Sequence, residues 1–305
     1  MILFRKEHPK MQNVHGLSLV TTLVNLRLKG RSVSIGTGFF YKNNKGDKSV
    51  IFLATNYHVI TGIGPSERGV KTVLGDEIAI QLRDKAGSTY EVIIPLFIYG
   101  YQNWLEHPTD DEADIVLIPL PAKLLENADF SYVSVEATLK DILLSPSSPV
   151  VMIGYPHGYR DTVNNLPIWK TGNLASEPEY DFDGKKVIVV DISAYPGMSG
   201  SPAFFVSHNG YATKKGEIFM GGGMAIHFLG VYASMQMLNS DLYLEQVTNH
   251  SAYKVTHSES LQLGHVWKAS LLEQIADGFE PDDYPNHFSR KVIIPEIKSS
   301  FEMKF

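Results

Sequence analysis

The chain has 305 residues and a formal net charge of −6, from 27 Lys and Arg against 33 Asp and Glu. Hydrophobic residues make up 44% and charged residues 20%, a balance typical of a globular protein rather than a disordered chain. A negative net charge argues against a nucleic-acid partner, because nucleic-acid-binding proteins normally carry a concentrated basic surface. The absence of Cys excludes disulfides and thiolate metal sites, and it fits a reducing compartment.

The N-terminal segment does not have the pattern of a signal peptide. Its first four residues are apolar, and charges and a proline follow within residues 5–10, whereas a signal peptide has basic residues before an apolar core of about 7–15 residues. Nowhere do about 18 apolar residues run without charges, so no membrane-spanning helix is expected. The sequence therefore predicts a cytoplasmic protein with no membrane partner.

The first part of the chain consists of short β-type runs separated by turn residues. Runs of this length with frequent Gly, Asn and Asp between them are typical of an antiparallel barrel or sandwich. They predict a first β unit over residues 1–120, with strands at 17–27, 34–41, 50–55, 77–82, 89–94 and 115–120.

A second set of β runs begins at residue 150. Residues 121–149 form a connection with one short helical or irregular piece, and they end in a Ser- and Pro-rich loop. The second β unit is expected over residues 150–245, with strands at 150–154, 167–176, 185–193, 203–207, 218–220 and 225–235.

Residues 246–305 are predicted to be a C-terminal extension of different character. A helix is expected over residues 265–277, where Trp267, Leu271 and Ile275 fall on one face and Gly278 stands at the C-cap position. Its apolar stripe should pack against a barrel. The tail from Glu280, with three prolines and several charges, should be extended.

One stretch carries the pattern of a catalytic nucleophile. Ser199 stands in Gly197-Met198-Ser199-Gly200-Ser201-Pro202, between two apolar β runs. Glycines on both sides of a serine allow a sharp turn and leave backbone N–H groups unobstructed, which acyl transfer requires. A tight turn would use similar residues for no chemical reason, so the function depends on other residues.

A nucleophilic serine needs a base, and the base needs an anion that holds its tautomer. His58 follows a strand directly, at the start of an expected tight turn, although a lone histidine there is more often structural. Asp114 directly precedes the apolar run 115–118 and should be drawn inward with it. A buried carboxylate needs a hydrogen-bond partner, and an imidazole N–H is a suitable one.

Together these segments resemble the three signatures of trypsin-like serine proteases, and most closely the Cys-free bacterial branch that includes the high-temperature-requirement proteases. The matching segments run in the order of that superfamily, over roughly residues 17–237. They are Thr55-Asn56-Tyr57-His58-Val59-Ile60, Asp114-Ile115-Val116-Leu117-Ile118 and Gly197-Met198-Ser199-Gly200-Ser201-Pro202, with support from Gly36-Thr37-Gly38-Phe39, Gly154-Tyr155-Pro156 and Gly230-Val231-Tyr232-Ala233-Ser234.

The resemblance implies an all-β fold of two packed six-stranded antiparallel β-barrels, followed by a C-terminal helix and an extended tail. It implies a serine endopeptidase that acts on protein or peptide substrates and needs no cofactor. Ser199 would be the nucleophile, His58 the general base and acid, and Asp114 the partner of the imidazole. The N–H groups of Gly197 and Ser199 would form the oxyanion hole.

Two departures from the family pattern lie next to the nucleophile. Met198 stands where many relatives carry the Asp that pairs with a newly cut N-terminus, so activation by that route is not expected. Tyr195-Pro196 stiffens the approach to the oxyanion hole, because proline fixes its own φ and biases the preceding residue to extended geometry. This stiffness is compatible with a pre-formed hole and with one that is held closed.

The resemblance also assigns a substrate pocket. Ser193 would lie at the base of the S1 pocket, with Ala233, Ser234 and Met235 on its wall. No carboxylate is among them, so a small or medium uncharged P1 residue is expected. If the alignment slips by two residues, Asp191 becomes the base.

Three other interpretations remain. Residues 197–201 nearly match the nucleophile elbow of α/β-hydrolases, but Pro202 and a β run follow instead of a helix. A double barrel with an unused site would be a catalytically silent binding or regulatory module. A histidine metal site is disfavoured, because His157, His208 and His227 are scattered and no H-E-x-x-H spacing exists. Restraint of a cytosolic protease by narrow specificity, or by a regulatory partner that involves the C-terminal extension, is a further hypothesis.

Overall fold

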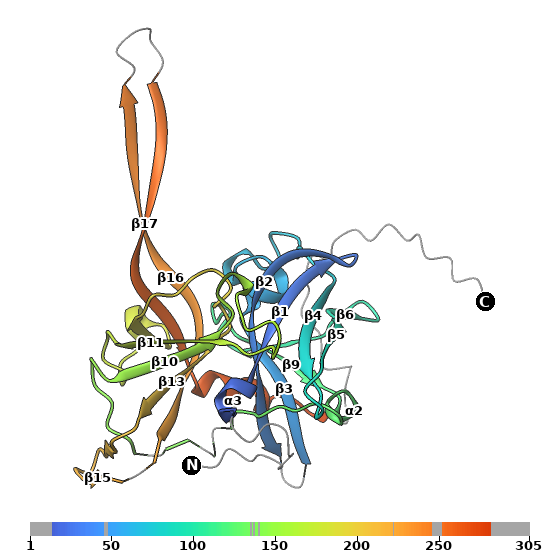
Figure 1. The fold of residues 1–305 in the computed structure, drawn as a ribbon. Coiled ribbons are helices and arrows are strands. Elements are labelled where there is room, and N and C mark those ends of the chain that lie inside the picture. Colours follow the sequence, from blue (N-terminus) through green and yellow to red (C-terminus); the bar gives the residue numbers. More distant parts are fainter. Residues whose placement is uncertain are drawn as a thin grey trace.

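The computed structural model of the chain describes residues 14–45, 48–134, 136, 138–139, 141–221, 223–245 and 252–281. The described chain is mainly β structure, arranged as two β units side by side with one long hairpin projecting from the second (Figure 1). This architecture confirms the all-β prediction. The expected extended tail beyond residue 281, the first 13 residues and the turn of the long hairpin at 246–251 lie outside the described residues.

The first β unit is one antiparallel sheet of seven strands in the order β5-β4-β1-β2-β3-β9-β8. Six of these strands correspond to the six expected runs, and the short edge strand β8 is additional. A small separate pair, β6 (Phe97–Ile98) with β7 (Tyr101–Gln102), lies beside it. The strands are β1 (Thr21–Leu28), β2 (Arg31–Lys45), β3 (Lys48–Thr55), β4 (Glu77–Arg83), β5 (Thr89–Pro95), β8 (Leu105–Glu106) and β9 (Val116–Leu120).

The second β unit is a closed barrel of six strands in the order β10-β11-β12-β17-β16-β13, as expected for this half. The expected strand at 218–220 is not part of this barrel: β15 (Ile218–Phe219) pairs only with β14 (Tyr211–Ala212) in a separate two-stranded hairpin, and β17 is the sixth barrel strand instead. The barrel strands are β10 (Pro149–Gly154), β11 (Ile168–Leu174), β12 (Val187–Asp191), β13 (Pro202–Ser207), β16 (Ala225–Glu245) and β17 (Ala252–Lys268).

The last barrel strand lies in the region that was expected to be a C-terminal extension. Strand β17 pairs with β12 from Val187↔Trp267 to Asp191↔Leu263 and closes the barrel against β16 on its other side. The boundary predicted between residues 245 and 246 would therefore divide the two paired strands β16 and β17. The helix expected over residues 265–277 is also shorter than expected, because its first four residues belong to β17.

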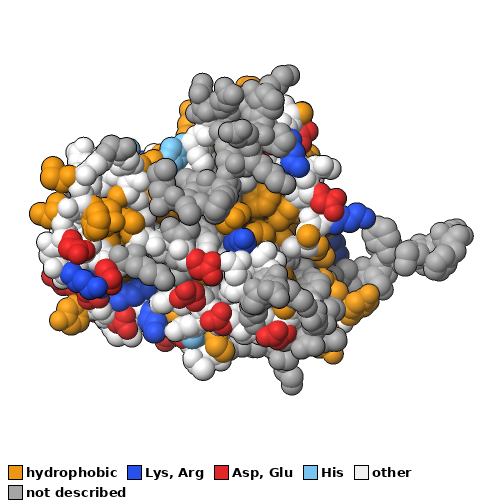
Figure 2. Space-filling model, turned by 90° about the horizontal axis from the view of Figure 1, so that it is seen from below, with side chains coloured by type: hydrophobic (Ala, Val, Ile, Leu, Met, Phe, Trp, Pro, Cys, Tyr) orange, Lys and Arg blue, Asp and Glu red, His pale blue; other side chains and the backbone are white. Residues whose placement is uncertain are grey.

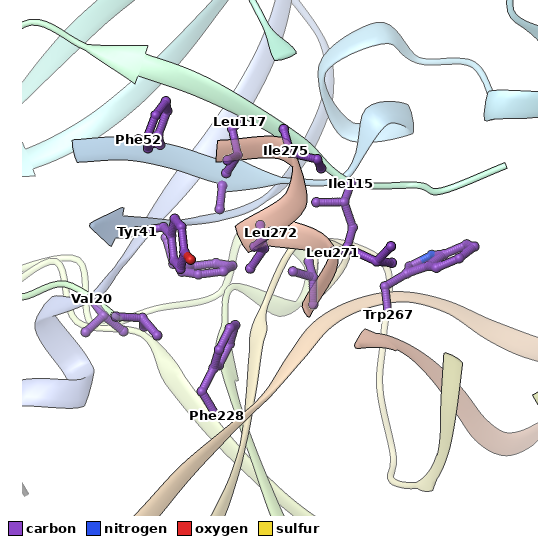
Figure 3. Packing of buried hydrophobic residues seen from close by; sticks show 14 of the residues in the cluster. Val20, Tyr41, Phe52, Ile115, Leu117, Phe228, Trp267, Leu271, Leu272 and Ile275 are labelled. Atoms are coloured by element: carbon purple, nitrogen blue, oxygen red, sulfur yellow. The ribbon is translucent and has the colours of Figure 1, made fainter. Parts of the chain in front are cut away.

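The C-terminal helix α3 (Ser270–Asp277) packs between the two β units (Figure 3). Its Leu271, Leu272 and Ile275 are buried in one cluster with core residues of the first sheet and the barrel. In the same cluster Phe39 of β2 contacts Phe228 of β16 edge to face, with ring centroids 5.6 Å apart. The expected packing of the apolar stripe is confirmed, and the helix joins both units instead of covering one.

The remaining helical elements are short. Each of the two other α-helices spans a single turn, and none of the helices described is long and apolar enough to cross a membrane. They are α1 (Tyr57–Thr61) and α2 (Ala122–Leu125), with 3₁₀ turns η1 (Gly16–Leu19), η2 (Pro65–Glu67), η4 (Pro156–Gly158) and η5 (Phe182–Gly184).

The described surface carries mixed charge. On the face shown in Figure 2, acidic and basic side chains are interspersed, and hydrophobic side chains lie in separate groups between them. One exposed hydrophobic group belongs to the β15 region, where Ile218 and Met220 are largely exposed. The negative net charge is therefore not concentrated in one patch on this face.

Candidate active site

His58 lies on the one-turn helix that follows strand β3. Strand β3 ends at Thr55, and helix α1 is capped by Gly62, whose left-handed backbone (φ +74°) lets its N–H donate to the carbonyl of His58 at 2.9 Å. The side chain of His58 is 33% exposed. The short turn thus fixes the backbone of the histidine while one side of its ring remains open to solvent.

Asp114 contacts His58 through both of its carboxylate oxygens. Oδ2 lies 2.6 Å from Nδ1 of His58, and Oδ1 accepts the backbone N–H of His58 at 3.1 Å. The Asp114 side chain is only 12% exposed, and the amide of Asn56 donates to its backbone carbonyl at 2.6 Å. Because an ionised carboxylate only accepts hydrogen bonds, Nδ1 must donate to it, and in the tautomer of the neutral ring that this requires, Nε2 is the acceptor nitrogen.

Ser199 follows a tight turn over residues 195–198. The N–H of Met198 donates to the carbonyl of Tyr195 at 3.0 Å, and Gly197, the third residue of the turn, has φ +92°. Proline in the second position and a glycine with positive φ in the third are typical of a type II β-turn. The sequence Tyr195-Pro196-Gly197 therefore determines the backbone conformation just before the serine.

Two backbone N–H groups beside Ser199 are free of protein acceptors. Neither the N–H of Gly197 nor that of Ser199 has a hydrogen-bond acceptor within the described part of the chain. The neighbouring carbonyls have donors of their own. The carbonyl of Pro196 accepts the N–H of His157 at 2.6 Å, and the carbonyl of Gly197 accepts the hydroxyl of Thr37 at 2.8 Å. Both carbonyls are thus held by other segments of the chain.

Met198 is fully buried in the core of the second barrel, in one cluster with Met152 and Ala194. Apolar packing therefore holds the loop at the position where many relatives of the recognised family use an ionised carboxylate. This contact accounts for a hydrophobic residue between Gly197 and Ser199.

The hydroxyl of Ser199 donates to the carbonyl of Ala233 on β16, at 2.9 Å. No hydrogen bond joins it to His58, and Nε2 of His58 has no protein partner among the residues described. The two residues come from different β units, but their backbones are linked. The N–H of Thr37 donates to the carbonyl of Ser199 at 2.8 Å, and the carbonyl of Thr37 accepts the hydroxyl of Thr55, three residues before His58, at 2.6 Å.

The residues expected to line a substrate pocket lie on two elements. Ala233, Ser234 and Met235 follow one another on β16, where Ala233 is buried and Ser234 exposed. Ser193 follows β12, and its hydroxyl donates to the side-chain oxygen of Gln262 on β17 at 2.9 Å. Sequence reasoning missed Gln262, because β17 was not recognised as a strand.

A cavity of about 360 Å³ lies beside the His58–Asp114 pair, between the two β units. Asp114, Ala233 and Ser234 line it, together with aromatic residues from η5 and β17. Burial lowers the pKa of His265 in its wall below the ordinary value, and the nearby Asp183 opposes this shift. The other lining residues are Pro65, Ser66, Glu112, Phe182, Lys185, Val187 and Trp267.

Thr37 and His157 are further site residues to which the sequence patterns assign no role. Thr37 lies in Gly36-Thr37-Gly38, which was noted only as a supporting match, and the sequence gives no signal that its hydroxyl reaches Gly197. His157 appeared only among scattered histidines. The described residues include no group of three or more His, Cys, Asp or Glu that could hold a metal ion.

The model of the trypsin-like peptidase domain matches residues 36–210, which is more than half of the chain. This match confirms the recognised superfamily, whereas kinship with the high-temperature-requirement branch stays a prediction. No curated protein matches the chain in sequence.

Three solved structures are similar in fold to the chain. The serine endoprotease from Yersinia pestis is 13% identical with a TM-score of 0.43; the match covers 85% of this chain and 62% of that one, so the chain spans less than two thirds of its length. Human heparin binding protein is 10% identical with a TM-score of 0.42, covering 91% and 96% of the two chains. An inactivated protease paralogue of the scabies mite is 14% identical with a TM-score of 0.38, covering 86% and 96%. On the evidence of the domain match, the chain belongs to the trypsin-like peptidase family.

Proposed function

We propose that the chain is a serine endopeptidase in which Ser199, His58 and Asp114 form the catalytic triad. The observation that carries the proposal is the His58–Asp114 pair, which directs the unprotonated Nε2 away from the carboxylate with no protein partner. A base needs this arrangement to take a proton from a nucleophile. The adjacent cavity offers room for the polypeptide on one side of the scissile bond.

The proposed reaction has two halves. Oγ of Ser199 attacks the scissile carbonyl carbon while its proton passes to Nε2 of His58, and the negative charge develops on the carbonyl oxygen. The C–N bond then breaks, and the leaving amine takes the proton from His58. Water hydrolyses the acyl-enzyme by the same route and restores the serine hydroxyl. Asp114 stays ionised and stabilises the imidazolium that forms in each half.

Formation of the reactive pair requires a rotation of the Ser199 side chain. Its hydroxyl, now bonded to the carbonyl of Ala233, must turn toward Nε2 of His58. Catalytic hydrogen bonds are often absent or long in free enzymes and form only in the complex with substrate. A substrate strand docked at β16 would bring its carbonyl to Ser199 and favour this rotation.

The type II turn supports a pre-formed oxyanion hole. Type I and type II turns differ by a flip of the central peptide, which here joins Pro196 to Gly197 and carries one of the two proposed donors. Its carbonyl is bonded to the N–H of His157, and Gly197 has the positive φ of the type II form. Of the two alternatives that the sequence left open, the turn supports the pre-formed hole.

The proposed P1 preference is a small or medium uncharged residue. Ser193 would form the base of the pocket, and its bond to Gln262 places a neutral amide there. Asp191, the alternative base, is an exposed residue at the end of β12. Cleavage sites mapped on a peptide library test this assignment. Ser193→Asp is expected to redirect cleavage to Arg and Lys, and strict cleavage after Arg or Lys by the wild type would contradict the assignment.

Labelling with a fluorophosphonate probe tests the proposed nucleophile. The wild type should be labelled on the peptide that contains Ser199, and labelling should vanish in Ser199→Ala. The hydrogen bond from the Ser199 hydroxyl to the carbonyl of Ala233 directs the hydroxyl to β16 and not to His58. This keeps one alternative open, a catalytically silent binding module of the same fold. Unlabelled wild-type protein whose thermal melting shows it to be folded would favour that module and exclude the endopeptidase.

Location and control are further proposals. A cytoplasmic location remains a prediction from the N-terminal sequence. Restraint by a regulatory partner that engages the C-terminal tail is likewise a proposal. Deletion of residues 282–305 tests this proposal. Peptidase activity that is unchanged both in the purified enzyme and in cell lysate would exclude a role of the tail in restraint.

A further inference from the structure

A buried ion pair adjoins the segments that carry His58 and Asp114. Arg68 directly follows η2, and its Nη2 lies 2.9 Å from a carboxylate oxygen of Glu106 on β8. The two side chains are only 12% and 3% exposed. Removal of two charges from water is costly, so a buried ion pair is weak evidence of a gain in stability. The other contacts of Arg68 indicate instead what the pair holds in place.

The guanidinium of Arg68 lies on the ring of the residue that precedes His58. Its central carbon is 4.6 Å from the centre of the Tyr57 ring. Tyr57 is the first residue of α1 and is fully buried. A guanidinium is planar and stacks on an aromatic face, and this attraction is stronger where water is excluded. Arg68 therefore restrains the start of the one-turn helix on which His58 lies.

The same guanidinium holds the loop that leads to Asp114. Its Nη1 donates to the backbone carbonyl of Asp111 at 3.0 Å. The carboxylate of Asp111 lies 3.5 Å from Nη1 but is largely exposed, so the bond to the carbonyl is the stronger restraint. Arg68 therefore restrains the backbone three residues before the proposed partner of the imidazole.

Glu106 directs Arg68 and is itself held in place. Its second carboxylate oxygen accepts the indole N–H of the buried Trp104 at 2.8 Å. Its backbone pairs with Val116 on β9, two residues after Asp114. The contacts of the ion pair thus reach the chain on both sides of Asp114, and they reach α1 as well.

We propose that Arg68 is a positioning residue that keeps His58 and Asp114 at hydrogen-bond distance. It acts through Tyr57 and the loop at Asp111, and not on the reacting atoms. The inference rests on the proposed endopeptidase function and adds a residue to that same site. The pair joins segments 56 positions apart, and a displacement of about 1 Å between catalytic groups can cost about a hundredfold in rate. A side chain that restrains both segments therefore supports turnover.

The double variant Arg68→Met, Glu106→Gln tests the proposal. It leaves no unpaired charge buried, and glutamine keeps an oxygen for the indole of Trp104, so its stability should remain close to that of the wild type. At a temperature where both proteins are folded, kcat for a peptide should fall by about ten- to a hundredfold with little change in KM, because the imidazole–carboxylate pair acts in the transition state. Wild-type kcat in the double variant overturns the proposal while the endopeptidase function stands.

Two further variants separate positioning from charge and from general damage. Arg68→Lys keeps the charge, but an ammonium offers no planar fork for both Glu106 and the carbonyl of Asp111, so kcat should again be low. Lys71→Met removes an exposed cation, paired with Glu67, from the same segment and should leave kcat unchanged. Wild-type kcat in Arg68→Lys, or an equal loss in Lys71→Met, overturns the proposal. If the double variant does not fold, Arg68→Lys decides by the same measurements.

A proton NMR signal gives a readout that does not depend on turnover. The Nδ1–H of His58, bonded to Asp114 at 2.6 Å, should resonate far downfield of the backbone amides, and its signal should disappear in Asp114→Asn. The signal should shift or broaden in Arg68→Met, Glu106→Gln and persist in Lys71→Met. An unchanged signal in the double variant, or no signal in the wild type, overturns the proposal. A changed signal together with wild-type protein that cleaves no peptide refutes the endopeptidase function and leaves the positioning role intact.

Discussion

The hydroxyl of Thr37 donates a hydrogen bond of 2.8 Å to the carbonyl of Gly197, a residue 160 positions further along the chain. The same oxygen accepts the N–H of Tyr155 at 3.1 Å. The backbone N–H of Thr37 donates to the carbonyl of Ser199, and its carbonyl accepts the hydroxyl of Thr55. One threonine of the first sheet thus holds the turn of the proposed oxyanion hole in the second barrel. The geometry of the site depends on contacts between the two β units.

Removal of the Thr37 hydroxyl should impair this turn. In Thr37→Val, which has nearly the same shape, the buried carbonyl of Gly197 and the N–H of Tyr155 lose their partner, at an expected cost of about 1–3 kcal/mol in the free energy of unfolding. The value of kcat should fall more than KM changes, because an oxyanion-hole donor acts in the transition state. Thr37→Ser keeps the hydroxyl and should retain both activity and stability. Equal behaviour of the two variants would contradict the assigned role.

Gly200 should tolerate no side chain. It has φ +86°, and a Cβ would collide with the carbonyl of Thr37 and the hydroxyl of Thr55. Gly30 offers a matched control, since its φ is similar (+76°) but a Cβ would meet no atom within 4 Å. Gly30→Ala should cost only the conformational strain of about 1–2 kcal/mol, whereas Gly200→Ala should cost about 4 kcal/mol or more. Denaturant unfolding of both variants measures the difference, and similar costs would refute the steric argument.

Asp114→Asn should nearly abolish turnover while the protein remains folded. An amide in place of the carboxylate can donate to Nδ1 of His58, which places the imidazole proton on Nε2, the wrong nitrogen for a base. A loss of about 10⁴ in kcat is expected for such a change. Asp111 serves as the control, because its side chain is 77% exposed and Asp111→Asn leaves the imidazole unchanged. Comparable losses in the two variants would show that the effect is not specific to the His58 pair.

Acidification should destabilise the fold through His227. Burial lowers the pKa of this histidine below its ordinary value of 6.5, against the opposing effect of its bond to the carbonyl of Leu139 at 2.8 Å. Below about pH 6.5 the unfolded chain therefore binds a proton that the folded chain still excludes, so stability is complete above this pH and falls as the pH decreases. His227→Gln, which keeps a donor for Leu139, should show a smaller loss between pH 7 and about pH 5. Identical pH profiles of melting temperature would contradict this assignment.

The candidate site could be proposed from the sequence because its three residues lie at strand ends. His58, Asp114 and Ser199 each adjoin a run with clear β pattern, and the three motifs occur in the order of the recognised family. The structure brings His58 and Asp114 together and places Ser199 against Ala233. The hydrogen bonds of the Thr37 side chain to Gly197 and Tyr155 were not predictable, because they join residues more than a hundred positions apart and no local pattern encodes them.

The missed strand β17 has a different cause. Trp267, Leu271 and Ile275 have helical spacing, which suggested one helix across the end of the barrel. In the structure Trp267 belongs to β17, where β12 and β16 supply hydrogen-bond partners on both edges, and the helix begins only at Ser270. Tertiary pairing decided the conformation at this junction, and a short periodic pattern carried too little information to reveal it.

Stopped-flow hydrolysis of an activated ester tests the central claim most directly. If Ser199 forms an acyl-enzyme with His58 as its base, the first turnover should release product in a burst equal to the concentration of enzyme, followed by slower steady-state hydrolysis. The burst should be absent in Ser199→Ala, and the acylated wild type should carry the added mass on the peptide that contains Ser199. A burst that persists in Ser199→Ala, or an acyl group on another residue, would contradict the proposed mechanism.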